Sequence, residues 1–186
     1  MVGISGSSAP QLGISLLRAL SECVEVETHL VVSAGGQQTL KLEAGIPLDE
    51  VLSLANFAYS ASDQHAPISS GSFMTDGMVV MPCSMRTLGA IAAGNSQDLL
   101  TRAADVTLRE RRRLVLVTRE APLNLIHIRN MPAATLAGAT VHPPVLSFSL
   151  KPRTIDDLLT QIVGTVLDQF AIPHAPSCGS GTSRTG

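Results

Sequence analysis

Two short apolar runs constrain the fold of this chain more than any other feature of its sequence. Residues 78–81 read Met-Val-Val-Met, and residues 114–117 read Leu-Val-Leu-Val. Compact apolar runs of this kind are typical of parallel strands that are covered on both faces by helices. Helix-like segments alternate with strand-like segments along the chain, so we predict a doubly wound α/β domain built on a parallel sheet.

The remaining segments follow the same alternation. Strands are predicted at residues 2–5, 28–33, 77–82 and 114–118. Helices are predicted from residue 10 to 20, after residue 33 through residue 43, and at residues 84–93, 97–110, 122–136 and 154–170. The last helix carries one apolar face, made of Ile155, Leu158, Leu159, Ile162, Val163 and Val166. We expect residues 1–172 to form a single domain, and residues 173–186, rich in Ser, Gly, Pro and Thr, to be disordered.

The composition narrows the classes of function. Of 186 residues, 45% are hydrophobic and 15% are charged, and the formal net charge is −2. Such a chain has no strong field to attract nucleic acid or an anionic membrane, and no apolar run long enough to span one. Three scattered cysteines and the lack of a signal-peptide pattern predict a cytoplasmic protein without a zinc site. The high apolar fraction indicates that part of the surface is buried in an oligomer.

Small and polar residues follow the first two predicted strands. The first leads into Gly3-Ile4-Ser5-Gly6-Ser7-Ser8-Ala9-Pro10, and the second ends in Ser33-Ala34-Gly35-Gly36. Ligands of doubly wound sheets bind beyond the carboxyl ends of the strands, where small residues allow close approach and helix N-termini favour phosphate. Tight turns with capping serines account for the same residues, so both interpretations stay open.

Charged residues follow the two apolar strands. Ser84, Arg86 and Thr87 lie in the first turn of a predicted helix, where a cation opposes the helix dipole unless an anion offsets it. Arg119 and Glu120 come directly after the second apolar strand. They form either a solvent-facing salt bridge or a phosphate-binding arginine beside an acid–base carboxylate.

One predicted helix carries a charged face. The spacing of Arg102, Asp105 and Arg109 places them on the same side of that helix. They form either a solvated ladder of salt bridges or a cationic wall for a phosphate. Cys83 is interpreted as a small buried hydrophobe rather than a nucleophile, because no base can be assigned to it.

Together these segments resemble the UbiX-type flavin prenyltransferases, within the wider family of flavin-dependent decarboxylase-like flavoproteins. The resemblance extends from residue 1 to about residue 172. Its most specific stretches are residues 70–73, 77–88, 99–106, 110–116, 118–123 and 138–141. It implies a flavodoxin-like, Rossmann-like domain with three αβα layers that binds FMN. It also implies a homo-oligomer, commonly a dodecamer, with FMN between subunits.

The resemblance also implies roles for individual residues. Cofactor binding falls to Gly3, Ile4, Ser5, Ser33, Ser84, Met85, Arg86, Thr87 and Arg119. Glu120, Ser5 and Glu43 correspond to catalytic positions, with Glu43 working beside Ser5. Arg102, Arg109 and Glu120 correspond to the substrate-phosphate site, and no metal ligand is implied.

The implied reaction joins the dimethylallyl group of dimethylallyl phosphate to N5 and then C6 of reduced FMN. Its product, prenylated FMN, is the cofactor of UbiD-type decarboxylases. Loss of phosphate develops negative charge that arginines stabilise. Ring closure at C6 needs a proton acceptor, a role for Glu120, the phosphate or both.

Three positions depart from the family pattern. Arg109 stands where lysine is usual, which keeps the charge and changes its geometry. Ser149 and Thr165 stand where the family has a phosphate-binding tyrosine and arginine, whose loss removes two contacts worth about 1–3 kcal/mol each. Two main hypotheses follow: a flavin prenyltransferase with an altered phosphate site, or an FMN-binding carrier or decarboxylase accessory subunit without prenyl transfer. A peptidyl-cysteine-type oxidative decarboxylase is a third reading, ranked below these.

Overall fold

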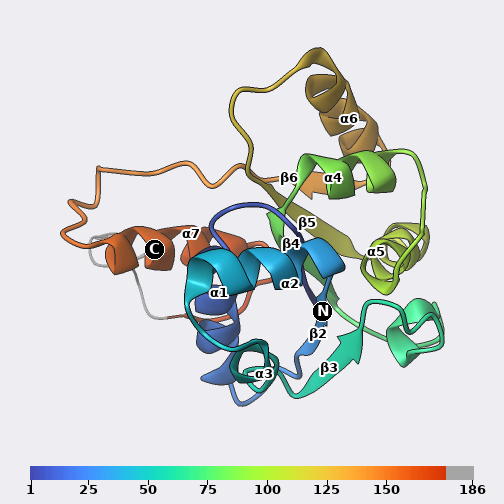
Figure 1. The fold of residues 1–186 in the computed structure, drawn as a ribbon, viewed down its shortest axis with the longest axis horizontal. Coiled ribbons are helices and arrows are strands. Elements are labelled where there is room, and N and C mark those ends of the chain that lie inside the picture. Colours follow the sequence, from blue (N-terminus) through green and yellow to red (C-terminus); the bar gives the residue numbers. More distant parts are fainter. Residues whose placement is uncertain (175–186) are drawn as a thin grey trace, which may run out of the picture.

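A six-stranded parallel sheet forms the centre of the molecule in the computed structural model, which describes residues 1–174 (Figure 1). Its strand order is β3-β2-β1-β4-β5-β6, and every neighbouring pair is parallel. The predicted doubly wound, three-layer α/β fold is therefore confirmed. The prediction of a disordered tail at 173–186 falls almost entirely outside the described residues.

The elements occur in the predicted alternation. The strands are β1 (Val2–Ile4), β2 (His29–Val32), β3 (Phe57–Ser60), β4 (Gly77–Cys83), β5 (Arg113–Thr118) and β6 (Ala139–Val141). The α-helices are α1 (Gln11–Ser21), α2 (Ala34–Thr39), α3 (Leu48–Leu52), α4 (Met85–Ala92), α5 (Leu99–Arg109), α6 (Leu125–Leu136) and α7 (Ile155–Asp168). A π-helical turn, Leu40–Ala44, continues α2, and a short 3-10 helix covers Pro67–Ser69.

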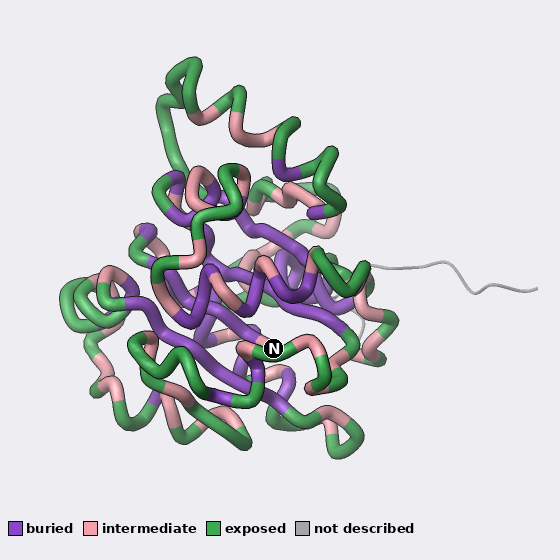
Figure 2. The backbone as a smooth tube through the Cα atoms, turned by 90° about the vertical axis from the view of Figure 1, so that its right-hand side faces the viewer, coloured by how far each residue is buried: buried purple, intermediate pink, exposed green. Residues whose placement is uncertain are grey.

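Both faces of the sheet are covered, as the apolar runs predict. Val79 and Met81 of β4 belong to an apolar cluster with α1 and α7, whereas Met78 and Val80 belong to a second cluster with α4 and α5. This alternation follows from the two-residue period of a strand. The buried backbone in the middle of Figure 2 is this sheet, and α1 and α7 lie across it from α4, α5 and α6 in Figure 1.

Several element boundaries differ from the predictions. The helix predicted at 122–136 begins only at Leu125, because Asn124 caps it through the N–H of His127. Ile155, assigned to the apolar face of the last helix, is 76% exposed in its first turn. Strands β3 and β6 and the helix α3 were not predicted. β3 is largely exposed and β6 has three residues, so neither carries a buried apolar run.

Residues 1–174 contain no candidate membrane span and no candidate metal cluster. No helix within residues 1–174 is long and apolar enough to cross a membrane. No group of three or more His, Cys, Asp and Glu side chains in that range is arranged to hold a metal ion.

Candidate functional site

Ser5 joins the loops that follow β1 and β4 at the carboxyl edge of the sheet. Its hydroxyl donates to the carbonyl oxygen of Pro82 at 2.9 Å and accepts from the backbone N–H of Ser84 at 2.8 Å. The N–H of Ser33, after β2, donates to the carbonyl oxygen of Ile4 at 2.9 Å. Because Ser5 is buried and both bonds are made, the ends of three adjacent strands are held at fixed separations.

A pair of glycines brings the loops after β1 and β2 into contact. A Cβ atom added to Gly6 would lie 2.9 Å from the Cα of Gly35, closer than real Cβ atoms come to a backbone atom. Any side chain at Gly6 therefore pushes the two loops apart. The bare surface left here permits the close approach of a ring or a phosphate group.

Serine hydroxyls cap the two helices that leave this edge. Ser33 accepts from the N–H of Gly36 at 3.1 Å at the start of α2, and Ser84 accepts from the N–H of Thr87 at 3.2 Å at the start of α4. The predicted capping is confirmed. The first turn of α4 has no acidic side chain and carries the exposed Arg86. The positive end of the helix dipole and a cation therefore lie together, which favours a bound anion.

Three of the residues predicted to bind cofactor have no side chain free for it. Gly3 lies within β1, where an added Cβ would touch the side chains of Met78 and Leu100. Ile4 and Met85 are buried in the two apolar clusters. Gly3 is also paired on both sides within the sheet, and the carbonyl oxygen of Ile4 accepts from Ser33, so the cofactor-binding role of these three positions stays a prediction.

Arg119 and Glu120 leave the end of β5 as exposed residues. The N–H of Arg119 donates to the carbonyl oxygen of Cys83 at 3.3 Å, and its carbonyl oxygen accepts from the hydroxyl of Ser7 at 2.7 Å. Glu120 accepts only from the N–H of the next residue, Ala121, at 3.1 Å. No ion pair within the described residues joins Arg119 to Glu120, so the simple salt-bridge interpretation is wrong.

Glu43 lies beside the loop after β1, in contact with residues other than Ser5. Its carboxylate accepts from the hydroxyl of Ser8 at 2.8 Å and from the N–H of Ala9 at 3.0 Å. Ala9 has a φ of +67°, a left-handed conformation that residues other than glycine rarely adopt. Glu43 therefore holds a strained turn in place, whereas the Ser5 hydroxyl is already engaged by Pro82 and Ser84.

Arg102 and Arg109 are not brought together by α5. Arg102 pairs with Asp105 at 3.0 Å and donates to the carbonyl oxygen of Ser69 at 3.2 Å. Arg109 pairs with Glu110 at 3.1 Å and not with Asp105. The predicted ladder of salt bridges along the helix is therefore limited to the pair between Arg102 and Asp105. Seven residues of helix separate the two arginines by about 10 Å. Arg109 comes shortly before β5 begins, so it lies toward the amino ends of the strands. Ser5 lies at the opposite, carboxyl edge of the sheet.

Several site residues were missed by the sequence analysis. Ser7 and Ser8 were treated only as parts of a small-residue turn, yet their hydroxyls bond Arg119 and Glu43. Thr118, the last residue of β5, has a buried hydroxyl that finds no partner in the described part of the chain. The signal available in the sequence was the run of three serines within four residues after the first strand.

Cys83 ends β4 next to this site and takes no chemical role there. It is completely buried, and burial raises the pKa of its thiol to about 12. A thiol with so high a pKa is a poor nucleophile at neutral pH. The interpretation of Cys83 as a small buried hydrophobe is confirmed.

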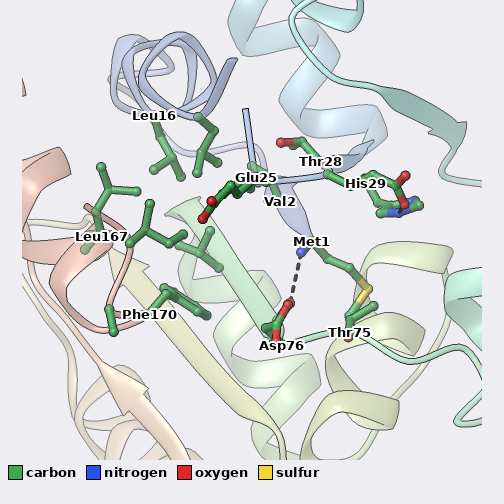
Figure 3. A pocket seen from close by; sticks show the side chains of 18 of the residues that line it. Met1, Val2, Leu16, Glu25, Thr28, His29, Thr75, Asp76, Leu167 and Phe170 are labelled. Carbon is green, nitrogen blue, oxygen red and sulfur yellow. Dashed lines mark hydrogen bonds and ion pairs between the residues drawn. The ribbon is translucent and has the colours of Figure 1, made fainter. Parts of the chain in front are cut away.

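A separate cavity of about 480 Å³ lies at the amino ends of the strands (Figure 3). Leu16, Leu167 and Phe170 line its apolar side. The amino group of Met1 donates to the carbonyl oxygen of Gly77 at 2.9 Å, and burial lowers its pKa to about 6. This cavity is at the opposite edge of the sheet from Ser5, so it is not part of the site described above.

The chain matches known proteins over most of its length. A family model described as "Flavoprotein" matches residues 1–167. The flavin prenyltransferase UbiX of Escherichia coli K12 is 51% identical over 172 residues, which cover 92% of this chain and 91% of that protein.

Two crystal structures share the fold closely. AnUbiX (PadA1), in complex with FMN and dimethylallyl pyrophosphate, aligns with a TM-score of 0.93 and 46% identity, covering 99% of this chain and 97% of the other. A dodecameric FMN-dependent UbiX-like decarboxylase from Escherichia coli O157:H7 aligns with a TM-score of 0.91 and 48% identity, covering 93% and 94%. Identity at this level over nearly the whole length, together with the family match, assigns the chain: it belongs to the flavoprotein family and, within it, to the UbiX-type flavin prenyltransferases.

Proposed function

We propose that this protein is a flavin prenyltransferase, which joins the dimethylallyl group of dimethylallyl phosphate to N5 and C6 of reduced FMN. The similarity to a structure that holds FMN and dimethylallyl pyrophosphate carries this proposal, because it extends over every element that builds the carboxyl edge of the sheet. We further propose that residues 1–172 act as one FMN-binding domain.

The flavin is held by the loops after β1, β2, β4 and β5 in this proposal. The residues assigned to it are Gly3, Ile4, Ser5, Ser33, Ser84, Met85, Arg86, Thr87 and Arg119. Three features of the edge support the assignment: the Gly6–Gly35 contact leaves it bare, the α4 N-terminus points a positive dipole at it, and Arg86 and Arg119 add two exposed cations.

The prenyl phosphate is bound between copies of the chain in this proposal. Arg102, Arg109 and Glu120 are assigned to it, yet Arg109 lies toward the amino ends of the strands while Glu120 follows their carboxyl ends. One copy therefore does not bring all three to one point. The exposed apolar residues of α6, Leu125, Ile126, Ile128 and Leu136, support a homo-oligomer. The dodecamer of the similar Escherichia coli protein is the assembly we propose.

The chemistry requires charge stabilisation and one proton acceptor. The bond between the allylic carbon and the phosphate oxygen breaks, the carbon bonds to N5, and the leaving phosphate takes the N5 proton. The prenyl double bond then gains a proton at its inner carbon while its tertiary carbon bonds to C6, and the C6 proton goes to Glu120 or to the phosphate. The arginines stabilise the leaving phosphate, and Glu43 keeps the loop that carries Ser5 in shape.

One observation favours a second candidate, an FMN-binding carrier or accessory subunit that lacks prenyl transfer. The hydroxyl of Ser149 pairs with that of Ser147 at 2.8 Å. The hydroxyl of Thr165 donates to the carbonyl oxygen of Ile162 at 2.8 Å and lies 3.1 Å from Nε2 of His142. Neither position supplies a cation, and Lys151 is the nearest basic residue in sequence to Ser149.

The test is an anaerobic incubation of the purified protein with reduced FMN and dimethylallyl phosphate, followed by the mass of the extracted flavin. A gain of one prenyl unit is the expected result. Unchanged FMN that stays bound would overturn the transferase and favour the carrier. Parallel reactions with dimethylallyl pyrophosphate identify the preferred donor.

The product's recipient and the compartment belong to the same proposal. A UbiD-type decarboxylase is the consumer we propose for prenylated FMN. We place the protein in the cytoplasm, which the free thiols of Cys23 and Cys83 support, because reduced thiols are typical of that compartment.

A further inference from the structure

Ser7 makes a bond that spans the candidate site. Its side chain is buried, with 7% of the residue exposed, and its hydroxyl donates to the carbonyl oxygen of Arg119 at 2.7 Å. Its own N–H donates to the carbonyl oxygen of Ser5 at 2.8 Å. Ser7 therefore connects Ser5, at the end of β1, with the segment that follows β5.

The segment that Ser7 holds has few other attachments. Within the described residues, only two hydrogen bonds from other parts of the molecule reach residues 119–122. One is the Ser7 bond at 2.7 Å, and the other is the longer bond from the N–H of Arg119 to the carbonyl oxygen of Cys83 at 3.3 Å. The Arg119 carbonyl belongs to the peptide unit that leads into Glu120. The orientation of that peptide, and with it the direction of the Glu120 side chain, depends on Ser7.

We propose that Ser7 is a positioning residue that holds the peptide between Arg119 and Glu120 and so orients the Glu120 carboxylate toward the substrate. The proposal rests on the proposed prenyl transfer, in which Glu120 accepts a proton. Small misplacements of reacting groups slow catalysis by as much as about 100-fold while leaving binding largely unchanged. If the hydroxyl only stabilised the fold, its loss would lower the melting temperature and would weaken the transfer rate and substrate binding to a similar extent.

The test compares Ser7→Ala with Ser7→Thr, which keeps the hydroxyl. Ser53→Ala is the matched control, because the hydroxyl of Ser53 also bonds a backbone carbonyl but lies exposed and far along the chain from the site. We expect Ser7→Ala to lower the single-turnover rate of prenyl transfer about 10- to 100-fold. FMN affinity and the KM for dimethylallyl phosphate should stay within about twofold of the parent, and Ser7→Thr should recover most of the rate.

Hydrogen exchange on the FMN-bound protein provides a readout independent of turnover. We expect Ser7→Ala to speed exchange at the N–H of Arg119, while peptides from β2 keep the parent rate. Unchanged turnover and unchanged exchange would overturn the role of Ser7, as would equal losses of rate, FMN affinity and melting temperature.

If the parent protein transfers no prenyl group, the proposed function fails, and the exchange measurement alone decides whether Ser7 orients this segment. If Ser7→Ala does not fold, Ser7→Cys replaces it, because a thiol is a weaker donor of similar size. Unaltered rate and exchange in Ser7→Cys would then count against the proposal.

Discussion

At the scale of single residues, short side chains define the geometry of the site. Ser5 joins β1 to β4, Ser7 joins β1 to β5, and Glu43 holds Ser8 and Ala9. Each contact connects parts of the chain that are distant in sequence. The chemistry we assign to Glu120 therefore depends on residues that take no part in the reaction themselves, Ser7 above all.

Replacing Glu120 with Gln removes the carboxylate proposed as the proton acceptor and keeps its size. We expect the rate of prenylated FMN formation to fall about 100-fold or more, as general-base loss typically produces. FMN binding, measured by titration of flavin fluorescence, should be unchanged. Glu22→Gln, at an exposed residue after α1, is the control. A Glu120→Gln enzyme as fast as the parent would show that the phosphate alone takes the proton.

Restoring the family residues at two positions tests the phosphate site. We expect Ser149→Tyr with Thr165→Arg to raise a poor transfer rate at low donor concentration about tenfold or more, because two polar contacts to phosphate return. Ser147→Tyr, two residues from Ser149, is the matched control. If the double variant transfers the prenyl group no faster than the parent, these two departures do not explain a weak reaction.

Burial of Cys83 predicts a sharp difference in thiol reactivity. With a pKa of about 12 in place of 9.0, its thiolate fraction at pH 8 is about a thousandfold lower than that of a free thiol. We expect iodoacetamide to modify the partly exposed Cys23 and to leave Cys83 unmodified until the protein is denatured. Peptide mapping by mass spectrometry measures both. Equal labelling of the two in the folded protein would contradict the buried position.

At the scale of elements, buried segments were the ones that the sequence made predictable. The apolar runs identified β4 and β5, and the stripe of leucines identified α1, because burial on both faces or on one helix face leaves a periodic pattern. β3 and β6 lack that pattern, since one is exposed and the other has three residues. Contacts set by tertiary packing, such as Glu43 to Ala9, have no local signature.

The exposed apolar side of α6 leads to a prediction about assembly. Ile126 is 67% exposed and Leu136 is 89% exposed, and α6 lies at the top of Figure 2 with little cover. We expect Ile126→Asp to lower the molar mass measured by size-exclusion chromatography with light scattering, because a carboxylate is unfavourable in an apolar interface. Val24→Asp, at a fully exposed valine after α1, should leave the mass unchanged. An intact oligomer of Ile126→Asp would exclude this part of α6 from the interface.

At the scale of the whole molecule, one sheet supports two apolar clusters and a site at a single edge. The four loops that build the site follow β1, β2, β4 and β5, so their relative positions depend on strand register throughout the sheet. The resemblance assigned individual residues to the cofactor and to the phosphate, and those assignments stay predictions. It did not reveal that Arg109 lies toward the amino ends of the strands, about 10 Å along α5 from Arg102. That separation follows from the direction in which α5 runs across the sheet.

The amino group of Met1 has a practical consequence for handling this protein. Any residue fused ahead of Met1 begins inside the cavity at the amino ends of the strands, among the carboxyl groups of Glu25, Glu27 and Asp76. Such a fusion replaces the amine that donates to Gly77 with an amide, and places new side chains against β2 and β4. We therefore expect an affinity tag at this end to alter the lining of this cavity and to shift the melting temperature, which thermal unfolding of tagged and untagged samples measures.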